Sequence, residues 1–298
     1  MNITRTLSLF ITSAIFMGCF AQQTTLLKKN PDNNTVFWQI TGKGLKEPSY
    51  LFGTFHLMCK EDIHFGTEFI KAIKQVREVY LEMNLDDPAT LLSAFLYINM
   101  AQNKKLKDLY SNDEYDRLEK YFHDSLNTSL RMFQKMKPYF LVAMLYPKML
   151  NCKTPSGIEE EIMKLARENK KKMNGLETMA FQASVFDSIP YEWQAKELLK
   201  NIDSFPFYKR QFDTVLFAYK NQQMDELARL LEKNEFGSDA YQDLLLKNRN
   251  LNWVKQIQPL LQTESVLIAV GAGHLTGRDG LIKLFGDMGY QVTPIYNK

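Results

Sequence analysis

Two short stretches near opposite ends of the chain decide the fold. The first reads Ser49-Tyr50-Leu51-Phe52-Gly53-Thr54-Phe55-His56-Leu57, and the second reads Val266-Leu267-Ile268-Ala269-Val270-Gly271-Ala272-Gly273-His274-Leu275. Each is an apolar run typical of a buried strand, closed by glycine, two residues and a His-Leu pair. A side chain just past a strand end lies at the rim of a sheet, where sites are commonly built. Two of the four histidines therefore have equivalent predicted places.

Taken singly, a Gly-x-x-His string is a weak signal, because a structural histidine bonded to the backbone is more common than a ligand. The matched pair favours a site, since neutral imidazole is a frequent metal ligand and a frequent acid or base near neutral pH. We therefore predict that His56 and His274 converge on one ion, with their ligand nitrogens roughly 3–5 Å apart. Separate structural roles are the alternative.

Strand and helix patterns surround both stretches. Strands are expected over residues 35–40, 50–54, 78–85, 265–270 and 291–296, and helices over residues 66–76 and 277–288. The first two strands should form a hairpin, and each end of the chain then completes a β-α-β unit. We predict an α/β (α+β) fold in which the two units share one mixed sheet.

Residues of about 88–262 read as a large helical insertion between the two units, with one apolar helix expected over residues 135–150. Aromatic and methionine residues recur within it, and helix packing is favoured there over an apolar groove for a peptide or a lipid. Because no low-complexity stretch or long linker divides the chain, residues 35–298 are predicted to form a single domain.

Two carboxylates in this pattern are candidate site residues. Glu82 falls inside the strand expected over residues 78–85, where burial without a partner is costly. Strand alternation places it with Tyr80 and Asn84 on one face, which is either solvated or shares a site with His56. Glu177 precedes a helix expected from Met179. From spacing alone, an acidic first-turn residue is slightly favoured for it over a site role.

Composition excludes some classes of protein. The 298 residues carry 37 basic and 34 acidic side chains, a net charge of +3 that leaves no footprint for nucleic acid or anionic lipid. Of the three cysteines, Cys59 and Cys152 lie in the body of the chain. They form no zinc pattern, and the sequence leaves open whether they pair or remain free thiols.

The N-terminus reads as a leader. Residues 1–21 have a basic start, an apolar run over residues 7–20 and small residues before Gln22, which predicts a signal peptide cleaved after Ala21. Lipoprotein processing that leaves a lipid anchor at Cys19 is the alternative. Either route exports the protein, to the periplasm or the medium on the first and to the cell envelope on the second. No later stretch is expected to span a membrane.

The sequence resembles the TraB/GumN family, which is related to the Tiki membrane-tethered proteases. The resemblance covers nearly all of the predicted mature chain and is carried by residues 38–40, 50–56, 81–83, 175–178 and 271–275. In the Tiki branch, two Gly-x-x-His motifs and acidic residues are proposed to form a divalent-metal peptidase site. The resemblance matches His56, His274 and Glu82 to that pattern. It also marks Glu177, and Glu159 at a position where many relatives carry aspartate.

The resemblance implies an exported metal-dependent hydrolase that acts on peptides or proteins. His56, Glu82 and His274 would bind one divalent ion, with manganese or cobalt favoured by the resemblance and zinc allowed by the ligand types. Glu177 or Glu159 would be a general base or would orient a ligand. The alternative is a non-catalytic binding protein that sequesters a peptide signal or a metal complex. The absence of a His-Glu-x-x-His string excludes a zincin.

Overall fold

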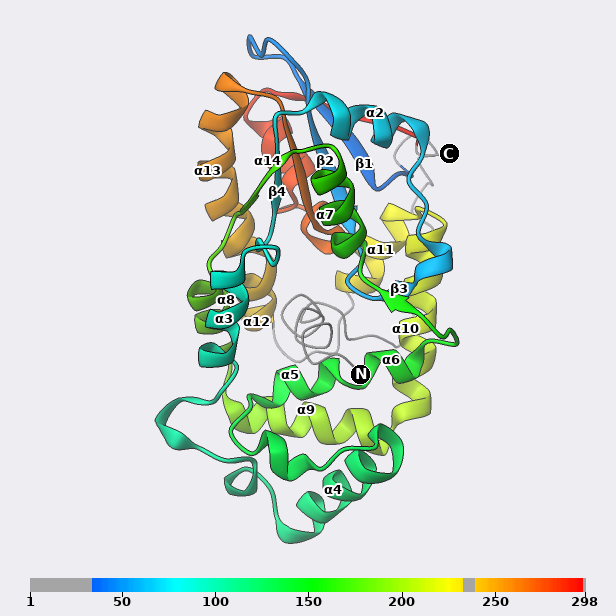
Figure 1. Ribbon diagram of the computed structural model, residues 1–298, viewed down its shortest axis with the longest axis vertical. Helices are drawn as coiled ribbons and strands as arrows, with labels where there is room; N and C mark the ends of the chain where they lie inside the picture. The colour runs from blue at the N-terminus through cyan, green and yellow to red at the C-terminus, as the bar shows by residue number, and fades with distance from the viewer. Residues whose placement is uncertain (1–33, 233–238, 297–298) are drawn as a thin grey trace.

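The computed structural model describes residues 34–232 and 239–296. The predicted signal peptide and Cys19 lie outside these residues. The fold is mixed α/β, as expected, with a sheet at one end of the molecule and α4, α5 and α9 at the other (Figure 1). The strands of the main sheet, in spatial order, are β6 (Lys172–Gly175), β4 (Glu78–Leu81), β7 (Val266–Gly271), β2 (Ser49–Thr54), β1 (Phe37–Thr41) and β8 (Gln291–Pro294).

The two motif strands form the centre of this sheet. β2 and β7 are parallel, with Thr54 opposite Gly271, and every residue of both strands is buried. β1 pairs antiparallel with β2, which confirms the predicted hairpin. The two ends of the chain therefore share one sheet. They also interlock, because β7 lies between β2 and β4, and β1 and β2 lie between β7 and β8.

Helices make up most of the remaining chain. α2 (Thr67–Gln75) links β2 to β4, and α14 (Leu281–Asp287) links β7 to β8. The predicted insertion also supplies the edge strand β6 and the short strand β5 (Pro155–Ser156). Its helices are α3 (Pro88–Tyr97), α4 (Asn112–Leu126), α5 (Pro138–Ala143), α6 (Tyr146–Met149), α7 (Ile158–Glu168), α8 (Met179–Asp187), α9 (Tyr191–Asp203), α10 (Phe205–Lys220), α11 (Met224–Glu232), α12 (Asp239–Gln242) and α13 (Asn248–Thr263). Among the described helices, none has the length and apolarity that a membrane span needs.

Two sequence-based expectations about these elements were wrong. The single helix expected over residues 135–150 is two short helices, α5 and α6, because Pro138 and Pro147 each lie in a first helical turn, where the missing N–H is tolerated. The strand expected over residues 78–85 ends at Leu81. The side chain of Asn84 accepts a hydrogen bond from the Asp86 N–H, at 3.2 Å, so a local turn takes the place of the last residues of the expected strand.

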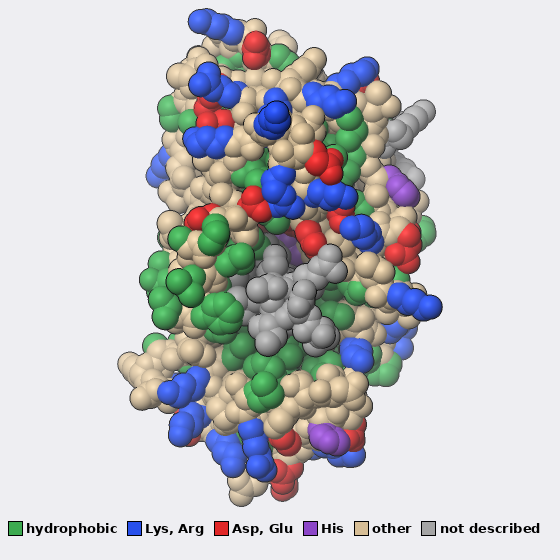
Figure 2. Space-filling model, viewed as in Figure 1, with side chains coloured by type: hydrophobic (Ala, Val, Ile, Leu, Met, Phe, Trp, Pro, Cys, Tyr) green, Lys and Arg blue, Asp and Glu red, His purple; other side chains and the backbone are tan. Residues whose placement is uncertain are grey.

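Apolar side chains of residues 133–144 pack inward, in agreement with the helix packing predicted for them. Met136, Tyr139 and Phe140 are buried, and Phe133 and Met144 pack against the core. Exposed apolar surface lies elsewhere, where hydrophobic side chains gather over α3 and α8 (Figure 2). The outer residues there include Leu92, Leu96 and Phe181.

Candidate functional site

The predicted site residues follow the ends of four neighbouring parallel strands. His56 comes two residues after β2, Glu82 directly after β4, Glu177 two residues after β6 and His274 three residues after β7. Because β6, β4, β7 and β2 are mutually parallel, their carboxyl ends meet at one edge of the sheet. All four side chains are buried. The fold thus gathers them from sequence positions more than two hundred residues apart.

Glu82 lies in the middle of the group. Its Oε1 accepts a hydrogen bond from the Gly271 N–H at 2.9 Å and lies 3.8 Å from His274 Nε2. Its Oε2 accepts one from Arg249 Nη2 at 2.6 Å. Burial alone would raise the pKa of Glu82. The positive charge of Arg249, with contributions from His56 and from the hydrogen bond of the Gly271 N–H, instead lowers that pKa to about 2, so Glu82 is ionised at neutral pH.

Arg249 is the largest feature that the sequence reasoning missed. Its Nε donates to Glu177 Oε1 at 2.9 Å, and its Nη2 donates to Glu177 Oε2 at 2.8 Å as well as to Glu82. Its guanidinium lies 4.8 Å from the centre of the Trp253 ring, whose N–H also donates to Glu177 Oε1. One signal could have found it. Trp253, Ile257 and Leu261 mark the buried face of α13, and Arg249 occupies the preceding i−4 position on that face.

Glu177 is not an acidic first-turn residue. Thr178 is the N-cap of α8, and its hydroxyl accepts from the Phe181 N–H, so Glu177 lies outside the helix. Its backbone N–H donates to the carbonyl oxygen of Glu82, which continues the pairing of β6 with β4. Both carboxylate oxygens of Glu177 are taken up by Arg249 and Trp253. Its observed role is therefore to hold Arg249.

His274 is held in one tautomer by Asn250, another residue missed from the sequence. The side-chain N–H groups of Asn250 donate to the backbone oxygens of His274 and Asp279, which leaves its Oδ1 as the acceptor for His274 Nδ1 at 2.6 Å. The proton is then on Nδ1, and Nε2 presents a lone pair that accepts from Arg249 Nη1 at 3.2 Å. Burial lowers the pKa of His274 to about 3, so the ring is neutral.

His56 is paired with Glu159 in the same manner. Its Nδ1 lies 2.6 Å from Glu159 Oε1, which also accepts a hydrogen bond from the Thr54 hydroxyl. Glu159 stands in the first turn of α7 and is buried. Burial by itself lowers the pKa of His56. The neighbouring Glu159 carboxylate, together with Glu82, outweighs that effect and holds the pKa above its ordinary value.

Two glycines allow this close packing. A Cβ at Gly157 would lie 2.7 Å from the carbonyl oxygen of His56, so only glycine lets the start of α7 approach the His56 segment. A Cβ at Gly271 would lie 3.2 Å from Glu82 Oε1 and 3.4 Å from His56 Nε2. Those two atoms therefore face the same small space above Gly271.

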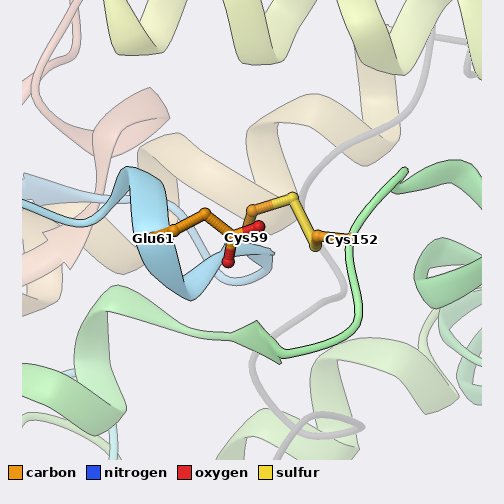
Figure 3. A group of neighbouring side chains, drawn as sticks. All are labelled: Cys59, Glu61 and Cys152. Carbon is orange, nitrogen blue, oxygen red and sulfur yellow. A yellow bond between two sulfur atoms is a disulfide. The ribbon is translucent and has the colours of Figure 1, made fainter.

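A disulfide joins Cys59 to Cys152 (Figure 3), the pairing that the sequence left open. It links strand β3 (Met58–Cys59) to the residues that precede β5, with a Cα separation of 5.8 Å, and β3 and β5 pair antiparallel. Among the described residues, Cys59, Cys152 and Glu61 form the one trio of possible ligands whose atoms all lie within 4.8 Å of one another. Because the two sulfurs are bonded to each other, this trio lacks the thiolates that a metal would need.

The predicted ligands fit a divalent ion in donor type. Glu159 and Asn250 each hold the Nδ1 side of a histidine, an arrangement that orients Nε2 toward a metal. The buried carboxylates of Glu82, Glu159 and Glu177 also lie close together, and a bound cation would lessen their mutual repulsion. In this structure the ligand atoms of His56, Glu82 and His274 are not all within 4.8 Å of one another, and Arg249 lies against two of the three residues.

Fold and site together define a mixed α/β protein with a buried histidine–carboxylate–arginine site at the carboxyl edge of its parallel strands. A profile of the TraB/PrgY/gumN family matches residues 36–294, and the chain belongs to this family. No curated protein and no solved structure matches this chain.

Proposed function

We propose that this protein is a metal-dependent hydrolase that cleaves peptides or proteins. The observation that carries the proposal is the convergence of Glu82 Oε1 and His56 Nε2 on the space above Gly271, with His274 Nε2 3.8 Å from the same carboxylate oxygen. His56, Glu82 and His274 would hold the ion. The family resemblance favours manganese or cobalt, and the ligand types also allow zinc. A divalent ion bound there supplies Lewis-acid polarisation of a carbonyl group and activation of water.

The chain's own residues have distinct tasks in this proposal. Glu159 and Asn250 fix the protons on the Nδ1 atoms of His56 and His274 and keep both Nε2 lone pairs directed inward. Glu177 positions Arg249. Glu159 Oε2 is buried and has no hydrogen-bond partner in the described part of the chain. Of the two carboxylates considered as a base, Glu159 is therefore the one with an oxygen left to take a proton.

We also propose that the protein is exported, through residues 1–21 as a signal peptide or through a lipid anchor at Cys19. The Cys59–Cys152 disulfide supports this, because such bonds persist in oxidising compartments. The place of action would be the periplasm, the medium or the cell envelope.

A peptide library tests the proposed activity. Protein lacking residues 1–21 is incubated with the library, first after removal of metal by chelator and then with added Mn²⁺, Co²⁺ or Zn²⁺, and new peptide ends are identified by mass spectrometry. We expect metal-dependent cleavage that His56→Ala abolishes. His123→Ala is the matched control, because His123 lies exposed on α4. Peptides that are retained but never cut would instead support the sequestering protein.

A further inference from the structure

Arg249 occupies the atoms of two predicted metal ligands. Its Nη1 lies 3.2 Å from His274 Nε2, and its Nη2 lies 2.6 Å from Glu82 Oε2. We propose that Arg249 is the built-in counter-cation of the metal-free site, and that a divalent ion binds only when Arg249 gives up His274. This inference rests on the metal site proposed above.

Arg249 and a metal ion would compete for the same lone pair on His274 Nε2. Because Asn250 Oδ1 accepts the proton on Nδ1, His274 Nε2 has one lone pair, in the plane of the ring. That lone pair accepts a hydrogen bond from Arg249 Nη1. The same lone pair would have to form the bond to a metal, so Arg249 and the ion cannot both use it.

Glu82 does not impose the same choice. A carboxylate has about four lone-pair positions, and the hydrogen bond from Arg249 Nη2 goes to Oε2 of Glu82. Its Oε1 faces His274 Nε2 and the space above Gly271. Glu82 can therefore keep its ion pair with Arg249 while Oε1 binds an ion. His274 is the residue at which the exchange takes place.

The structure provides a place for Arg249 after the exchange. Its Nε and Nη2 remain bound to Glu177, and its Nη1 also donates to the carbonyl oxygen of Leu245 at 3.1 Å. Leu245 belongs to a π-helical turn, Asp243–Lys247, directly before α13. Single π-helical turns inside helices are frequent at functional sites. A small movement about this turn would release His274 and keep the buried guanidinium paired.

Calorimetry of Mn²⁺ binding to metal-free protein tests the exchange. Arg249→Lys keeps the charge, but its three N–H donors cannot repeat the contacts that the five donors of the guanidinium make with Glu82, Glu177, His274 and Leu245. Arg249→Met with Glu177→Gln removes the guanidinium and one carboxylate together, which keeps the buried charge balanced if Arg249→Met alone fails to fold. We expect the double variant to bind Mn²⁺ about tenfold more tightly than wild type, because no charged hydrogen bond has to be given up. Arg77→Met, at an exposed side chain, is the control and should bind as wild type does.

The outcomes separate this inference from the proposed function. The first outcome is that wild type binds Mn²⁺, and that Arg249→Lys and the double variant both fold and bind it equally or less tightly. The exchange is then overturned and the metal site stands. If only the double variant binds, the exchange is supported and a metal-dependent wild-type enzyme is not. If no protein binds, both proposals fail. A measurement on wild type alone complements these, since zinc should shift the guanidinium NMR signals of Arg249. Unchanged signals on a zinc-bound protein would overturn the exchange.

Discussion

Glu159 shows how a single side chain prepares this site. It holds His56 by the Nδ1 side and is itself held by Thr54, so the orientation of the imidazole depends on one buried carboxylate. Glu159→Gln keeps an acceptor for the His56 proton but removes the charge that strengthens the bond. We expect Mn²⁺ affinity to fall about 10–100-fold in calorimetry. Glu168→Gln, at the exposed end of the same helix, should change nothing. Equal affinities in the two variants would contradict this role.

Gly271 tests the space between Glu82 and His56. In Gly271→Ala the new methyl group would lie 3.2 Å from Glu82 Oε1 and 3.4 Å from His56 Nε2, inside the proposed ion position. We expect no detectable Mn²⁺ binding and a loss of about 1–3 kcal/mol of folding stability from overpacking.

The control for this variant is another glycine. Gly286→Ala places a methyl group in α14 with no atom within 4 Å and should raise stability by about 1 kcal/mol. Normal metal binding by a folded Gly271→Ala protein would place the ion elsewhere.

At the scale of elements, the disulfide and the β3–β5 pair join two segments that carry the site. His56 stands just before β3, and Glu159 stands just after β5. The crosslink spans 93 residues, so Cys59→Ser with Cys152→Ser should cost about 2–5 kcal/mol in denaturant unfolding. Mn²⁺ affinity should fall as well. An unchanged unfolding midpoint after full reduction would show that the pairing of β3 and β5 suffices alone.

The pairing of β4 with β6 predicts a pH dependence. Burial opposes ionisation of Glu78, but hydrogen bonds from Lys172, Tyr80 and Asn174 outweigh it and hold the pKa of Glu78 below its ordinary value. A depressed folded-state pKa adds stability above the unfolded-state pKa of about 4.5, and this stability is lost as the pH falls through the folded-state value. Thermal melts of wild type should therefore decline below about pH 4.5 more steeply than those of Glu78→Gln. If the melting temperatures of the two proteins fall equally as the pH is lowered, ionised Glu78 makes no such contribution to stability.

At the scale of the whole molecule, the proposed export predicts where the mature chain begins. We expect protein from its native host to start at Gln22, because small residues precede that position, or at an acylated Cys19. Mass spectrometry of the intact protein measures this directly. Finding Met1 on the purified protein would refute the leader.

Local patterns in the sequence were enough to predict five of the six strands of the main sheet, all but the edge strand β6. Buried strands need continuous apolar runs, so residues 50–54 and 265–270 were recognisable, and the histidines that follow them were placed at strand ends. The shared sheet, the β1–β2 hairpin and the family assignment are confirmed. Whether the site binds a metal stays a prediction. Errors arose where local chemistry overrode periodicity, as at Pro138 and Asn84.

The partners within the site were decided by tertiary structure alone. Insertion of β7 between β2 and β4 brings Gly271 and His274 beside Glu82, and no local pattern encodes that strand order. The same holds for Arg249 and for the disulfide, because both depend on segments that meet only after folding. Periodicity reports which side of an element is buried. The side chain that a buried charge meets there depends on the packing of elements distant in sequence, and that contact sets the charge, tautomer and access of this site.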